Sequence, residues 1–387
     1  MIFCKGKFES IQALMHLFTS YALASGQVIN PSKSTVFYGS ISPARIDQIT
    51  DLIGLNKGSL PFTYLGVPIF KGNPKRTHLQ PIADKIRSKL LAWKASLLSI
   101  VGRVTLVKSV IQGMIVHPIS IYSWPIKLLK DIEAWSINFI WSGDISKRKL
   151  VTVSLKKVCK PLSEGGLGIR SLVLLNESTN LKLCWDLLNS QEDWAILIRS
   201  KVLRGRRVIS YHIYSSIWSG IKSEFDLILN NSSWQIGSGS DINLWVDSWC
   251  GDPLASPLHI PTHLHAQLTA TVSHFIVNFQ WCIPFCVYIS FPDVKHLAEQ
   301  VTIPFEASED KPVWKNSSNG DLSFKEAFEF KYGTRQNINW AKVIWSPDIP
   351  PSKSHFVWRL MHNKVPTDDN LMTRGIHSPS MCSSCNS

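Results

Sequence analysis

Three successive apolar stripes constrain the fold of this chain more than any other feature. Within each stripe, apolar residues recur every three or four positions, the period typical of helices that bury one face. The stripes are Leu79, Ile82, Ile86, Leu90 and Trp93; Val104, Val107, Ile111 and Met114; and Leu128, Ile132, Trp135 and Phe139. The third ends at Ser142-Gly143, a favourable helix stop. Residues 79–143 therefore predict packed amphipathic helices.

Positive charge is concentrated in the same part of the chain. The 387 residues carry a formal net charge of +13. Residues 71–210 hold 24 basic and 9 acidic residues, whereas residues 211–387 hold 12 and 16. A concentrated positive field predicts a polyanionic partner, and nucleic acid is favoured over anionic lipid.

The basic side chains of residues 79–115 lie off the apolar stripes, on the predicted outer faces of the helices. Cationic outer faces suit the phosphate backbone of RNA or DNA, which binds without sequence preference. The candidate nucleic-acid-binding residues are Lys85, Lys89, Lys94, Arg103 and Lys108. The alternative is a lysine-rich surface that is merely solvated.

Two stretches, residues 109–126 and 253–292, contain no charged residue and are the candidates for membrane spans. The first contains two prolines, and the second contains several histidines, an asparagine and a glutamine. A span needs about 20 predominantly apolar residues. We therefore expect a soluble chain with no membrane partner, and eight cysteines without disulfide-scaffold spacing predict reduced thiols inside the cell.

Candidate metal and catalytic groups are few. Cys382 and Cys385 have the spacing of half a zinc site, and His377 could add a third ligand, but structural zinc needs four. The adjacent Asp368 and Asp369 follow Thr367 and predict a helix start rather than a two-metal site. Residues 165–168 (GGLG) lack the Lys-Ser/Thr of a phosphate loop and predict a turn. Neither a catalytic residue nor a small-molecule substrate emerges from these patterns.

A series of short motifs nevertheless occurs in a fixed order along the chain. They are NPSKS at 30–34, YLGVP at 64–68, WK at 93–94 with LS at 98–99, GRVTLVKSV at 102–110, FIWSG at 139–143, GGLGIR at 165–170, and a Trp/Gly pattern from 234 to 249. In this order they resemble the C-terminal part of a plant LINE-type (non-LTR) retrotransposon reverse transcriptase. The end of the chain, from Phe324 to Cys385, resembles the zinc-binding region of these enzymes, whose further histidine and cysteine are missing here.

The resemblance implies an α+β, mainly helical fold in five parts. These are a palm remnant (1–72), a basic helical thumb (73–145), a Trp-rich connector (146–252), an irregular linker (253–320) and a truncated zinc-binding-type helical module (321–387). In the family, the palm aspartates that hold Mg²⁺ lie upstream of a strand resembling residues 2–4. We therefore expect no Mg²⁺ site and no polymerase activity.

The leading hypothesis is a catalytically incomplete reverse-transcriptase fragment that binds RNA or DNA weakly and without sequence preference. One alternative is a non-enzymatic protein-interaction module built on the Trp-rich residues 211–387. Another is a pseudogene product without function. Nuclear placement is implied by the resemblance alone.

Overall fold

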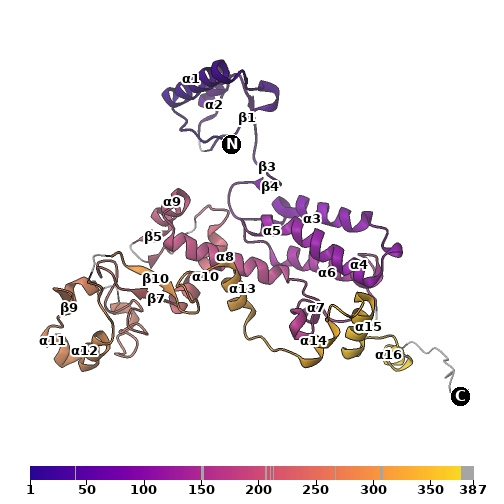
Figure 1. The fold of residues 1–387 in the computed structure, drawn as a ribbon. Helices are drawn as coiled ribbons and strands as arrows, with labels where there is room; N and C mark the ends of the chain where they lie inside the picture. Colours follow the sequence, from indigo (N-terminus) through magenta and orange to yellow (C-terminus); the bar gives the residue numbers. More distant parts are fainter. Residues whose placement is uncertain are drawn as a thin grey trace, which may run out of the picture.

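The computed structural model describes residues 1–39, 41–149, 152–204, 207–209, 211, 213–265, 267–305 and 308–375. Helices dominate these residues, and their strands pair in two-stranded ribbons (Figure 1). The predicted α+β, mainly helical class is therefore confirmed.

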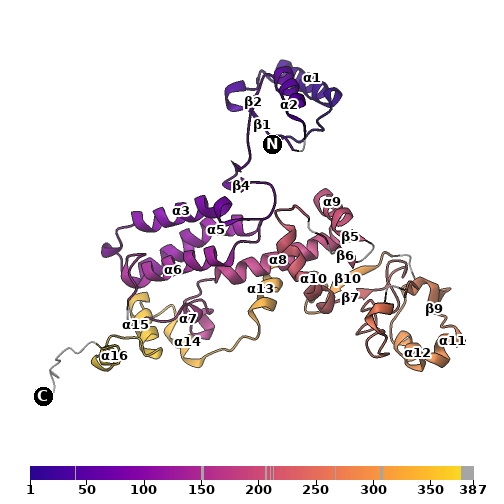
Figure 2. The same cartoon turned by 180° about the vertical axis from the view of Figure 1, so that it is seen from behind.

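The N-terminal part stands apart from the remainder in both views (Figures 1 and 2). It holds α1 (Phe8–Ser25), α2 (Pro43–Ile53) and the parallel pair β1 (Thr35–Val36) and β2 (Asn56–Lys57). The chain then forms the antiparallel hairpin β3 (Phe62–Tyr64) and β4 (Val67–Ile69) before it enters the helical body. Both turn residues of this hairpin have a positive φ, 49° for Leu65 and 81° for Gly66, and glycine adopts this conformation at little cost.

The three predicted stripes form the first hydrophobic core. Their helices are α3 (Arg76–Ala92), the continuous α4 (Ile100–Leu106), η3 (Val107–Ile111) and α5 (Gln112–Ile119), and α6 (Ile126–Ser142). Leu79, Ile86 and Leu90 of the first stripe are at most 1% exposed, and Ile132 and Phe139 of the third are fully buried. Gly143 ends α6 in the left-handed conformation, as predicted.

Residues Ile100–Ile119 form a helix long and apolar enough to cross a membrane by length and composition. One face of this helix, with Val104, Ile111 and Ile115, packs into the first core. A core helix of a globular protein has the same properties, so this observation is weak evidence for a span.

The first core extends beyond the predicted thumb boundary at 145, because α8 (Leu172–Asn189) belongs to two cores. Leu172 and Leu175 pack with α3 to α6, whereas Leu181 and Trp185 pack into a second core. Between α6 and α8 lie α7 (Leu155–Val158) and the turn η4 (Leu162–Glu164). The second core is completed by α9 (Asp193–Val202), α10 (Trp218–Asn231), α13 (Phe324–Tyr332) and Trp314 of β10 (Lys311–Trp314). The hairpin of β5 (Leu203–Arg204) and β6 (Arg207–Val208) packs against it through Leu203 and Val208. The partner strand of β10 is β7 (Ser232–Gln235), whose Trp234 packs on a third core.

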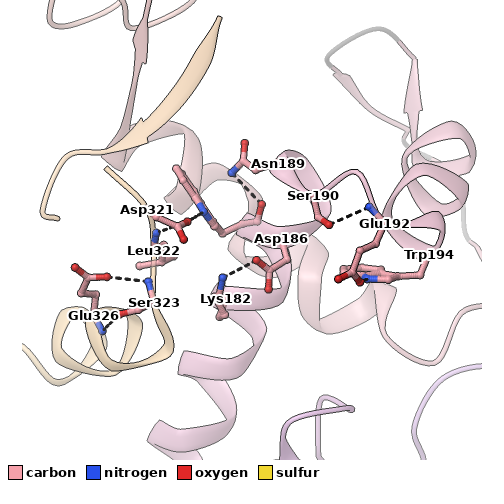
Figure 3. Close-up of polar contacts among 11 residues, drawn as sticks. Lys182, Asp186, Asn189, Ser190, Glu192, Trp194, Asp321, Leu322, Ser323 and Glu326 are labelled. Atoms are coloured by element: carbon pink, nitrogen blue, oxygen red, sulfur yellow. Dashed lines mark hydrogen bonds and ion pairs between the residues drawn. The ribbon is translucent and has the colours of Figure 1, made fainter. Parts of the chain in front are cut away.

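Polar contacts fix the start of α13 on the end of α8 (Figure 3). The Trp185 indole donates to Asp321 Oδ1 at 2.6 Å, and the same carboxylate oxygen accepts the Leu322 amide at 2.8 Å. Ser323 and Glu326 form a capping box at the first turn of α13. The Glu326 carboxylate is hydrogen-bonded by Ser323, and these bonds lower the pKa of the Glu326 carboxyl.

Residues 253–320, expected to form an irregular linker, contribute to a third core instead. Val272, Phe275, Val294 and Ala298 are buried there with Trp245 and other residues of the preceding connector. The segment contains β8 (Ile276–Val277), β9 (Gln280–Trp281), α11 (Phe285–Ser290) and α12 (Pro292–Glu299). The expectation failed because these apolar residues follow no helical or strand period.

The last described residues are helical, as expected for the module predicted over residues 321–387. After α13 come α14 (Asn339–Ile344), α15 (Pro351–Met361) and α16 (Asp368–Met372). Asp368 and Asp369 occupy the first turn of α16, which confirms the predicted helix start. Figure 1 places α15 and α16 at one end of the helical body formed by α3 to α6.

Candidate nucleic-acid interface

Three of the predicted phosphate-binding residues lie on an open surface. Lys85 and Lys89 are one turn apart on α3, and Lys94 follows this helix just before the turn η2 (Ala95–Leu97). All three side chains are exposed, and none forms an ion pair within the described residues. Residues i and i+4 of a helix are neighbours, so Lys85 and Lys89 present adjacent charges to solvent.

Arg103 differs from these lysines because it is partly buried and its guanidinium is bound to backbone carbonyls, so its contact with phosphate stays a prediction. Its Nε and Nη2 donate to Ala95 O at 3.2 and 2.8 Å, and its Nη1 donates to Ile140 O at 3.3 Å. Burial lowers the pKa of this guanidinium. Arg103 therefore fastens α4 to the turn before it and to the end of α6, and its replacement would disturb the fold.

Lys108 is also withdrawn from the predicted outer face. It lies half-buried on η3, which is one π-helical turn, and burial lowers its pKa. A Cβ placed on Gly168 would lie 3.3 Å from the Lys108 Nζ, so the ammonium faces the GGLG turn. Its charge also lowers the pKa of His355 on α15, although burial of that ring is the larger cause. Lys108 therefore lies against the C-terminal module.

The GGLG segment is a turn, as predicted, and it anchors that module. Gly165 O accepts the Trp358 Nε1–H at 2.7 Å and the His362 Nε2 at 3.0 Å. A carbonyl oxygen can only accept, so Nε2 carries the proton in this contact. A Cβ at Gly165 would lie 2.7 Å from the Trp340 ring, and one at Gly166 would lie 1.9 Å from Lys160 O. Neither position has room for a side chain.

Sequence reasoning missed this anchoring contact entirely. Gly165 and Trp358 are separated by 193 positions, and neither belongs to a periodic pattern that could have paired them. The only available signal was the density of tryptophan near the C-terminus, where Trp340, Trp345 and Trp358 all pack on the first core.

The predicted half zinc site, Cys382 and Cys385 with His377, lies outside the described residues. Within the described ranges, no group of three or more His, Cys, Asp or Glu side chains could hold a metal ion. Cys282 and Cys286 are both exposed, but the described residues supply no further ligand beside them. The residues described here therefore do not form a zinc site by themselves.

Comparison with known proteins finds one matching family model and one similar protein. Residues 322–387, which include α13 to α16, match the family model described as zinc-binding in reverse transcriptase. A protein of Arabidopsis thaliana described as a ribonuclease H protein is 25% identical over 332 residues, which cover 82% of this chain and 54% of that protein. The chain therefore spans about half the length of this relative.

These two similarities support a retrotransposon-related protein. The predicted resemblance to a reverse transcriptase is confirmed at this coarser level. The region that matches this family model docks on the GGLG turn through Trp358 and His362.

Proposed function

We propose that this chain is a catalytically incomplete fragment of a plant LINE-type reverse transcriptase that binds RNA or DNA weakly and without sequence preference. Support comes from the ordered motifs between residues 30 and 249, from the match over 322–387 and from the similarity to the Arabidopsis protein. The proposed role of binding rests on the exposed positive charge beside the first core.

One observation carries the binding proposal: the exposed lysines of α3. Lys85 and Lys89 extend from α3, and Lys94 follows its end; the opposite face of α3 is fixed in the first core. Such cations contact phosphates and carry no base preference. This helix face is open to solvent along its length. It therefore suits a wide nucleic-acid duplex better than a single strand, which a protein can enclose.

The test measures duplex binding across a salt series. We expect the purified chain to bind unrelated duplexes about equally, and Lys85→Ala/Lys89→Ala to weaken binding to all of them. Each lost phosphate contact lowers the log–log salt slope by about 0.9, so the double variant should flatten the slope by about 1.8. Lys85→Arg/Lys89→Arg keeps the charge and should bind as wild type. Equal slopes for wild type and the alanine variant would refute the role of α3.

We also propose that the chain does not polymerise DNA. Nucleotidyl transfer assisted by Mg²⁺ needs several carboxylates around the metal. The most obvious pair, Asp368 and Asp369, instead lies in the first turn of α16, where negative charge favours the helix. Template-dependent incorporation of dNTPs by the purified chain above a protein-free control would contradict this expectation.

A further inference from the structure

A basic cleft of about 560 Å³ lies between the segment that follows α6 and the C-terminal helices. One wall supplies Arg148, Lys149 and Lys157, and the opposite wall supplies His362, Lys364 and Arg374. The α3 lysines are not among its lining residues. The cleft is thus a second concentration of positive charge, built jointly by the thumb side and the zinc-binding-type module.

The positive charge of this cleft is not neutralised from within. Among the described residues, none that lines the cleft is acidic, and none of its five cations takes part in an ion pair. The pKa of the His362 imidazole is lowered, mainly by burial of the ring and also by the nearby charges of Lys157 and Lys160. His362 is therefore a neutral hydrogen-bonding part of the wall at neutral pH.

The two walls are held in place by contacts that need no ligand. His362 and Trp358 both bond to Gly165 O, which joins α15 to the GGLG turn. That turn is tied to α7 by the amides of Leu167 and Gly168, which donate to Val158 O at 3.0 Å and Lys160 O at 2.9 Å. On the opposite wall, the Lys364 amide donates to Arg359 O at 2.8 Å. The cations therefore converge on a preformed space.

We infer that this cleft binds the sugar–phosphate backbone of a single nucleic-acid strand, an inference that rests on the proposed function. A strand offers a row of phosphates that can neutralise several converging cations at once. The volume lies in the range of about 300–1,000 Å³ typical of pockets that enclose small ligands, so the cleft can enclose a short stretch of one strand but not the full width of a duplex. The lining contains no Phe, Tyr or Trp among the described residues, so binding proceeds without base stacking or base preference.

The open face of α3 and the enclosed cleft differ in shape, so we assign them different nucleic-acid ligands. The exposed face of α3 contacts duplex, whereas the cleft takes the unpaired strand. Because the cations come from both walls, a bound strand also joins the C-terminal module to the thumb through charge, in addition to the Gly165 contacts.

The experiment compares two matched charge-removal variants of the full chain. Lys157→Gln/Arg374→Gln removes one exposed cation from each wall, and Lys85→Gln/Lys89→Gln removes two from α3. Binding is measured by fluorescence anisotropy on a mixed-sequence single-stranded DNA and on a duplex, across a KCl series. Each contact contributes about 0.7 to the slope on a single strand. We expect the cleft variant to flatten the single-strand slope by about 1.4 and the α3 variant to leave it unchanged.

Two controls separate the possible failures. Lys157→Arg/Arg374→Lys keeps both charges and should retain the wild-type slope, and thermal unfolding establishes that each variant is folded. If wild type and the cleft variant give the same single-strand slope, the inference is overturned even where the α3 variant weakens duplex binding. If the α3 variant leaves the duplex slope unchanged while the cleft variant flattens the single-strand slope, the α3 part of the proposed function fails and the cleft inference stands. If the chain binds neither nucleic acid, both are overturned.

Discussion

Replacing Trp358 with alanine is expected to lower the free energy of unfolding by about 3–5 kcal/mol, as for other large-to-small changes in a core. The side chain is 1% exposed and belongs to the first core, although it comes from the C-terminal module. Its ring lies parallel to that of Trp141, with centroids 6.1 Å apart. Alanine would open a large cavity in the buried interface between α15 and the helices of the first core. Urea unfolding followed by tryptophan fluorescence measures the change.

The matched control for this prediction is Trp358→Phe. Phenylalanine keeps most of the apolar contact but loses the indole N–H that donates to Gly165 O. That carbonyl retains His362 as a donor, so the lost bond should cost only about 1 kcal/mol. A loss below 1 kcal/mol for the alanine variant would show that Trp358 does not hold the module on the thumb.

The parts of the fold that follow a local period could be predicted from the sequence. The stripes of α3, α4 to α5, and α6 were found because burial of one helix face imposes a repeat of about 3.6 residues. The end of α6 was found because Gly143 adopts the left-handed conformation that stops a helix. These signals depend only on neighbouring residues.

Features that depend on distant contacts could not be predicted in this way. Arg103 lies off its stripe, so the pattern assigned it to solvent, but the carbonyls of Ala95 and Ile140 meet it from other elements. The third core was missed because Val272, Phe275 and Val294 follow no period and are gathered only by the tertiary fold.

The candidate site also has one part that a local period predicts and one part that depends on distant contacts. The exposure of Lys85 and Lys89 follows from the stripe of α3 and was predicted correctly. The basic cleft joins residues near 150 to residues near 370, and no property of either segment alone indicates that they face each other. The basic run at 147–149 was visible in the sequence, but its partners were not.

The tryptophans of the 234–249 pattern should serve the third core and should not stack on nucleic-acid bases. Trp245 is 9% exposed, and its ring meets Phe291 edge to face, with centroids 5.7 Å apart. Trp249 is 4% exposed and donates its Nε1–H to Leu244 O at 2.8 Å. A base could not reach either ring face without opening this core. Both residues also lie in the acidic half of the chain, which disfavours phosphates.

Trp245→Ala is therefore expected to lower the free energy of unfolding by about 3–5 kcal/mol and to leave single-strand binding by the folded protein unchanged. Trp245→Phe, which preserves a ring against Phe291, should lose less than half as much. Urea unfolding and anisotropy on the same preparations give the two readouts. Stacking on bases would produce the opposite pattern, because an exposed aromatic platform contributes about 1–3 kcal/mol per base to binding and little to folding. Unchanged stability together with weakened binding would move Trp245 from the core to the nucleic-acid interface.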